Sequence, residues 1–144
     1  MAPRVLISDA LSPAAVTIFK ERGVEADFQP GLGKKKDKLA SVIGGFDGLA
    51  IRSVTKVTAK LLERAERLKV IGRAGIGVDN VDISAATAKG IIVMNTPFGN
   101  SITTAEHAIT LMLALAREIP QADASTQAGK WEKNRFMEIG RAHV

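Results

Sequence analysis

The sequence has no cysteine and few aromatic residues, and each shortage excludes a class of function. Without cysteine there are no disulfides, no thiolate metal ligands and no thiol nucleophile. Aromatic residues make up only 4% of the chain, whereas nucleic-acid-binding surfaces interleave them with positive charge. No apolar run is long enough to span a bilayer, and the first residues lack a signal-peptide pattern. We therefore expect neither a nucleic-acid nor a membrane partner, and a cytoplasmic location.

What the sequence does contain is enough apolar material for a core. Hydrophobic residues make up 46% of the 144 residues, a length typical of one domain with part of a second. The net charge is +5, and the basic residues are dispersed apart from one run that includes Lys34, Lys35, Lys36 and Lys38. Because this run lies where a loop enters a predicted helix, we interpret it as a solvated face.

Apolar runs and helical patterns alternate along the chain. The runs lie at 5–7, 24–28, 48–51, 68–72 and 91–94, and helices are predicted between them, with Thr58 and Asp82 as N-caps. Strands that alternate with helices at this spacing form a parallel sheet with right-handed crossovers. The pattern predicts an α/β fold, a flavodoxin-like doubly wound five-stranded sheet of order 2-1-3-4-5. A longer helix, apolar nearly all round, is expected from Ser101 to about Arg117, with Ser101, Thr103 or Thr104 as its cap.

Basic residues follow two of the predicted strands. Arg52 and Ser53 come directly after the third strand, and Arg73 ends the fourth, ahead of Gly75 and Ile76. Ligands of such sheets bind outside the carboxyl ends of the strands. Two arginines, together with exposed N–H groups of Gly75 and Ile76, predict a site for a small, multiply charged anion.

Other interpretations of these residues are weaker. Gly75-x-Gly77 lacks the third glycine of a dinucleotide fingerprint, because Asn80 stands there. A signalling receiver would need an aspartate where Arg52 follows the third strand. The acidic residues Asp79 and Asp82 are better explained as turn and cap residues than as general bases. We expect no metal site and no catalytic residue within this chain.

Several segments together resemble one family. They are Leu6–Asp9, Ile51–Thr58, Gly72–Asp82, Val93–Pro97, Gly99–Ser101, Ala105–Glu106 and Gly129–Glu132. In this order they resemble the amino-terminal part of the D-3-phosphoglycerate dehydrogenases, a group within the D-isomer-specific 2-hydroxyacid dehydrogenases. The resemblance spans residues 4 to about 137.

The resemblance implies an enzyme that oxidises 3-phospho-D-glycerate with NAD, the first step of serine biosynthesis, and that forms a homo-oligomer when intact. It implies a flavodoxin-like substrate-binding domain over 1–98 and the start of a truncated NAD-binding domain, with interdomain and dimer helices, over 99–137. The implied substrate-binding residues are Arg52, Ser53, Arg73, Gly75, Ile76 and Asn100, with phosphate contacts from Lys133 and Arg135. Ile76 would also lie near the nicotinamide.

The chain departs from the family pattern after Met137. The complete glycine fingerprint, the acidic ribose ligand and the catalytic residues expected beyond that point are absent, and residues 138–144 are expected to be a non-native tail. We therefore expect the fragment to be inactive alone. Two alternatives remain open: another D-2-hydroxyacid dehydrogenase, of the glyoxylate/hydroxypyruvate reductase or D-lactate type, and a non-catalytic anion-binding module.

Overall fold

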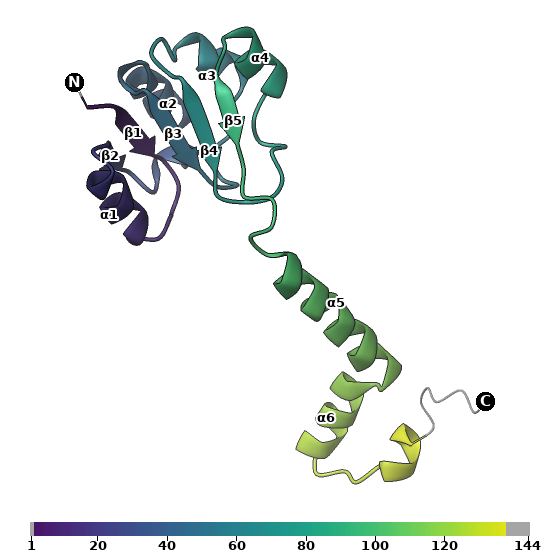
Figure 1. Ribbon diagram of the computed structural model, residues 1–144. Coiled ribbons are helices and arrows are strands. Elements are labelled where there is room, and N and C mark those ends of the chain that lie inside the picture. The colour runs from purple at the N-terminus through teal and green to yellow at the C-terminus, as the bar shows by residue number, and fades with distance from the viewer. Residues whose placement is uncertain (1, 138–144) are drawn as a thin grey trace. The chain divides into compact units, whose positions relative to one another are not determined.

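Five parallel strands form one sheet in the order β2-β1-β3-β4-β5 (Figure 1). The computed structural model describes residues 2–137. The strands are β1 (Arg4–Ile7), β2 (Glu25–Phe28), β3 (Gly48–Ile51), β4 (Val70–Arg73) and β5 (Ile92–Met94). Every neighbouring pair is parallel, so the predicted flavodoxin-like strand order is confirmed.

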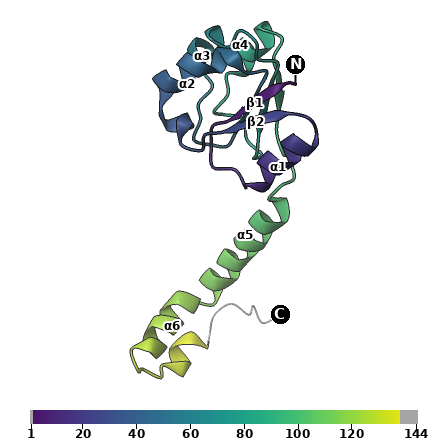
Figure 2. The same ribbon diagram turned by 90° about the vertical axis from the view of Figure 1, so that its left-hand side faces the viewer.

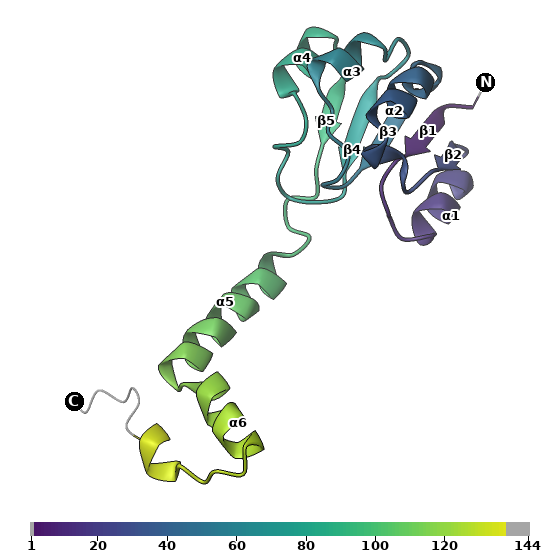
Figure 3. The ribbon, with the colours of Figure 1, turned by 180° about the vertical axis from the view of Figure 1, so that it is seen from behind.

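Helices cover both faces of the sheet. On one face lie α2 (Lys36–Val42), α3 (Ala59–Glu63) and α4 (Ile83–Ala88), which stand in front of the strands when the molecule is seen from behind (Figure 3). Helix α1 (Ala14–Glu21) lies on the opposite face, beside β1 and β2 (Figure 2). Short 3₁₀ turns, η1 (Leu32–Lys34) and η2 (Ile43–Gly45), flank α2.

The core lies between the sheet and the three-helix layer. Register pairs Leu6 with Leu49 and Leu49 with Ile71, so these side chains form a row across one face. All three are buried, and they pack with Ile43 and Leu62 from the helical layer. Because both faces of a parallel sheet need cover, its central strand β3 is a continuous apolar run, and the sequence reveals it for that reason.

The opposite face of the sheet carries smaller side chains and has less cover. Register aligns Val5 with Gly48 and Val70, and Ala50 with Gly72. A groove of about 490 Å³ runs along this face. At its β5 edge, Ile92 is 63% exposed and Met94 is 58% exposed. The fold unit therefore leaves apolar surface over β4 and β5.

Two predicted caps are confirmed. Thr58 Oγ1 accepts a hydrogen bond from the Leu61 N–H at 3.3 Å, and Asp82 Oδ1 accepts one from the Ala85 N–H at 2.9 Å. A capping oxygen satisfies an N–H group that the first helical turn cannot pair internally. Both short helices therefore begin where the sequence predicts.

We expect Asp82→Ala to lower the free energy of unfolding by about 1 kcal/mol, because the Ala85 N–H loses its acceptor. Urea denaturation would measure the loss. Asp82→Asn retains a capping oxygen and is the matched control. Equal losses in the two variants would contradict the capping role.

The chain divides into two compact units, with the boundary between Gly99 and Asn100. The second unit contains α5 (Ser101–Ala116), α6 (Ile119–Gln127) and the turn η3 (Lys133–Phe136). The side-chain cap predicted for α5 is wrong: Asn100 is the N-cap residue, and no side chain makes the capping hydrogen bond. None of the helices in residues 2–137 is both long and apolar enough to cross a membrane.

The apolar character predicted for α5 is visible within the second unit. Leu111, Met112, Leu113 and Leu115 are all more than half exposed. The assignment of this unit to an NAD-binding domain stays a prediction. The tail predicted over 138–144 lies outside the described residues.

Candidate functional site

Strand register brings the two predicted arginines to one edge of the sheet. Ile51 of β3 pairs with Arg73 of β4, so Arg52 begins the loop beside the end of β4. Both side chains therefore lie at the carboxyl edge, where parallel sheets bind their ligands. The expectation that Arg52 and Arg73 share an edge is confirmed.

A buried carboxylate shapes the loop that carries Arg52. Asp9 is 1% exposed, and its Oδ2 accepts hydrogen bonds from the backbone N–H groups of Arg52 at 2.7 Å and Thr55 at 3.1 Å. Its Oδ1 accepts the Thr55 hydroxyl at 2.6 Å, and that hydroxyl lies 2.8 Å from Ser8 Oγ. The loop 52–55 is thus wrapped around the Asp9 carboxylate and held by these hydrogen bonds.

The Arg52 side chain is exposed and reaches the end of β1. Its Nη1 donates to the Ala10 carbonyl at 3.4 Å, and Ser53 beside it is also exposed. Asp9 holds the backbone on either side of Ser53, so the loop is fixed while these two side chains face solvent. A fixed loop with exposed polar groups suits ligand binding.

Arg73 is held by its own loop. Its Nη1 donates to the Gly77 carbonyl, and its Nη2 lies 4.0 Å from Asp79 Oδ1. The side chain is only 12% exposed, and its buried Nε has no hydrogen-bond partner among residues 2–137. A buried donor without an acceptor costs free energy, so this guanidinium has capacity for one more acceptor.

The prediction that Gly75 presents a free N–H is wrong. That group donates to the Arg73 carbonyl at 3.0 Å, because the chain turns tightly after β4. Gly75 matters through its missing side chain, since a Cβ there would lie 2.8 Å from Arg73 Nη1. The Ile76 N–H makes no backbone hydrogen bond within the described chain, and its side chain is 42% exposed.

Asn80 joins the two loops. Its Nδ2 donates to the carbonyls of Arg52 and Thr55, both at 2.7 Å. The backbone carbonyl of Asn80 accepts a hydrogen bond from the Val57 N–H at 2.8 Å. The residue that breaks the glycine fingerprint therefore connects the loop after β3 to the loop after β4.

We expect Asn80→Ala to lower the free energy of unfolding by about 2 kcal/mol, because two carbonyls lose their donor. Asn80→Asp should cost more, since a carboxylate would then face both carbonyls. Guanidinium denaturation would measure both changes. A loss below about 0.5 kcal/mol in both variants would show that Asn80 does not join the loops.

Three predicted site residues belong to the second unit. Asn100 precedes α5, and Lys133 and Arg135 lie in η3. Arg135 pairs with Glu132 at 3.4 Å, and the Ser125 hydroxyl that donates to Glu132 at 2.7 Å lowers the pKa of that carboxyl. Their roles toward a ligand stay predictions, as do those of Arg52, Ser53, Arg73, Gly75 and Ile76.

Sequence reasoning missed two positioning residues, Asp9 and Asn80. In the sequence, Asp9 only follows the first strand, and Asn80 stands where a dinucleotide fingerprint would have its third glycine. A carboxylate or amide directly beside a strand end was the available signal, but their partners lie 25–46 residues away. Only the fold brings these groups together.

The described residues do not fit a dinucleotide pyrophosphate. The loop 75–80 is followed by a cap at Asp82 and a helix of six residues, and Asn80 points inward to two carbonyls. No group of three or more His, Asp or Glu residues in the described chain could hold a metal ion. What the edge offers is two guanidinium groups, a serine hydroxyl and the Ile76 amide, which are groups that bind anions.

A five-stranded parallel sheet of this order, with helices on both faces, is an α/β domain of the flavodoxin-like class. Residues 5–136 match the family model of the D-isomer specific 2-hydroxyacid dehydrogenase, catalytic domain. The chain belongs to this family.

The most similar curated relatives include D-3-phosphoglycerate dehydrogenases. Those of Archaeoglobus fulgidus and Methanocaldococcus jannaschii are 47% and 50% identical over 136 residues, which are 94% of this chain. The human enzyme is 49% identical over 134 residues, or 93% of the chain. The chain spans about 25% of the length of each of these relatives.

Solved structures agree with the fold. The Pyrococcus horikoshii protein PH0520 is 32% identical, with a TM-score of 0.81 over 97% of this chain and 43% of that one. The NAD⁺-bound 3-phosphoglycerate dehydrogenase of Entamoeba histolytica is 31% identical, with a TM-score of 0.70 over 81% of this chain and 40% of that one.

Proposed function

We propose that this chain is the substrate-binding part of an NAD-dependent dehydrogenase that oxidises 3-phospho-D-glycerate, the first step of serine biosynthesis. The observation that carries the proposal is the pair of loops at the carboxyl edge, fixed by Asp9 and Asn80, that present Arg52, Ser53 and Arg73. The names of the relatives at 47–50% identity support the phosphorylated substrate.

The substrate carries two anionic groups, and the edge offers two cationic ones. We assign the carboxylate to Arg73 and the Ile76 amide, with Arg52 and Ser53 for the other anionic end. A substrate carboxylate would pair with Arg73 more strongly than the Gly77 carbonyl does, because a charge-assisted pair is stronger than a bond to a neutral carbonyl. The unpartnered Nε–H lies on the same edge of the guanidinium as Nη2, so a carboxylate on that edge would accept from both groups in a bidentate contact.

The remaining parts of the enzyme belong to the intact protein. Asn100, Lys133 and Arg135 would complete the substrate and phosphate contacts, and Ile76 would lie beside the nicotinamide. NAD is the proposed cofactor, and it would accept the hydride from the substrate. The exposed leucines of α5 support a homo-oligomer. We place the enzyme in the cytoplasm and expect the 144-residue chain to be inactive alone.

The test uses the full-length protein encoded at the source locus. NADH formation from 3-phospho-D-glycerate should exceed that from D-glycerate, which lacks the phosphate. Preference for an unphosphorylated 2-hydroxy acid would favour the glyoxylate/hydroxypyruvate or D-lactate type. Binding of 3-phospho-D-glycerate without any turnover would favour a non-catalytic anion-binding module.

Arg73→Ala should lower kcat/KM for 3-phospho-D-glycerate by about 10- to 100-fold, because a charge-assisted contact to the substrate is lost. Steady-state kinetics would measure it. Arg22→Ala is the matched control. Arg22 directly follows α1, and its substitution removes the same charge but should leave kcat/KM unchanged. Equal losses of kcat/KM in the two variants would show that Arg73 does not contact the substrate.

A further inference from the structure

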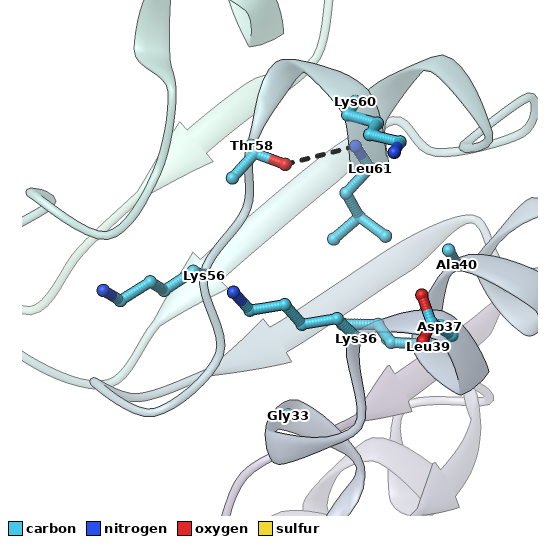
Figure 4. Close-up of a pocket in the computed structure, with 9 residues that line it drawn as sticks. All are labelled: Gly33, Lys36, Asp37, Leu39, Ala40, Lys56, Thr58, Lys60 and Leu61. Atoms are coloured by element: carbon cyan, nitrogen blue, oxygen red, sulfur yellow. Dashed lines mark hydrogen bonds between the residues drawn. The ribbon is translucent and has the colours of Figure 1, made fainter.

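A second cationic region lies away from the arginine edge, between the start of α2 and the segment that leads into α3. It is a cavity of about 190 Å³ (Figure 4). Its lining includes three lysines, Lys36, Lys56 and Lys60, and one acidic residue, Asp37. Lys36 and Asp37 belong to the basic run that the sequence alone interprets as a solvated face. In the structure, these two residues line a cavity.

The charge in this pocket is unbalanced. Three lysines line it with one aspartate, and no ion pair within 4.0 Å joins any of the three lysines to an acidic group of residues 2–137. Figure 4 shows the Lys36 side chain extended toward the segment of Lys56. Like charges gathered on one surface repel each other, and an anion bound among them would relieve the repulsion.

The pocket also offers a neutral donor and an apolar floor. Thr58 Oγ1 accepts the Leu61 N–H at 3.3 Å, so its own proton is available to a ligand. Leu39 and Leu61 form part of the lining and are buried. The lining therefore combines flexible cations with a fixed hydroxyl over apolar side chains.

Gly33 is one of the residues that line the pocket. It is buried, and a Cβ there would lie closer than 3.0 Å to atoms of Asp9 and Thr55. The missing side chain therefore lets this part of the lining pack directly on the Asp9–Thr55 pair. The volume suits a phosphate group on a short carbon chain and is smaller than pockets for drug-sized ligands.

We propose that Lys36, Lys56, Lys60 and Thr58 form a binding site for a small dianion, a phosphate monoester or inorganic phosphate, separate from the Arg52 and Arg73 edge. Lysine ammonium groups bind phosphate as point charges on adaptable stems. Three of them with a threonine hydroxyl match a dianion better than a monoanion, since Asp37 already offsets one positive charge.

The experiment is a titration of the ¹⁵N-labelled 144-residue chain with inorganic phosphate, with sodium chloride at equal ionic strength as the blank. The amide resonances of Gly33, Lys56, Thr58 and Lys60 should shift and saturate at millimolar phosphate, and chloride should not move them. Lys36→Gln with Lys56→Gln should weaken this binding at least about fivefold.

The matched control is Lys35→Gln with Lys38→Gln, which also removes two positive charges, from residues of the basic run that lie outside the pocket lining. It should change phosphate affinity less than about twofold. The proposal is overturned if phosphate moves none of the four amides, if chloride moves them equally, or if the two double variants weaken binding alike. The phosphate and chloride titrations of the wild-type chain can overturn the proposal by themselves, so the test does not depend on the variants folding correctly.

Discussion

Asp9→Ala is expected to lower the free energy of unfolding by about 3–5 kcal/mol. Asp9 is 1% exposed and accepts three hydrogen bonds, from the N–H groups of Arg52 and Thr55 and from the Thr55 hydroxyl. Alanine would leave the two N–H groups buried without an acceptor. The loop that carries Arg52 and Ser53 would lose its internal support.

Asp9→Asn is the matched control, because it keeps the shape of the side chain. Its carbonyl oxygen can still accept both N–H groups, and its amide can donate to Thr55 Oγ1, whose hydroxyl can turn toward Ser8 2.8 Å away. We expect a loss of only about 1–2 kcal/mol, for the missing charge. Chemical denaturation gives both values. If alanine and asparagine cost the same, the three hydrogen bonds do not organise this loop.

Gly33→Ala is expected to destabilise the chain by about 3 kcal/mol or more, through overpacking. An added Cβ would lie closer than 3.0 Å to Asp9 Oδ1 and Thr55 Oγ1. These two atoms hydrogen-bond to each other at 2.6 Å and are buried, so neither can move away without breaking that bond.

Gly31→Ala tests the same change two residues earlier. Nothing lies within 4 Å of a Cβ at Gly31, and its φ of −102° suits alanine. We expect no loss of stability, or a gain of up to about 1 kcal/mol from the restricted unfolded chain. Thermal unfolding of both variants provides the comparison. A Gly33→Ala variant as stable as Gly31→Ala would mean that the Asp9–Thr55 pair has room to shift.

The fold was predictable because its signals are local. A sheet buried on both faces needs strands that are apolar throughout, and Gly48–Ile51 and the run that ends at Gly72 show this directly. Thr58 and Asp82 lie just before their helices and cap them as expected. The strand order followed from parallel pairing with helical crossovers.

The site was only partly predictable because its supports are not local. The positions of Arg52 and Arg73 at strand ends could be inferred from the sequence. Their present partners could not, since Arg52 reaches Ala10, 42 residues away, and Asn80 reaches back 28 residues to Arg52. The tight turn that takes up the Gly75 N–H depends on backbone angles that residue types alone do not specify.

Residue-resolved titration with 3-phospho-D-glycerate would show whether the loops after β3 and β4 form one anion site. The amides of Ser53 and Ile76 should shift together with a single dissociation constant, and the Arg73 Nε resonance should shift with them as this group gains an acceptor. Binding that shifts one loop without the other, or that leaves Arg73 Nε unmoved, would contradict it.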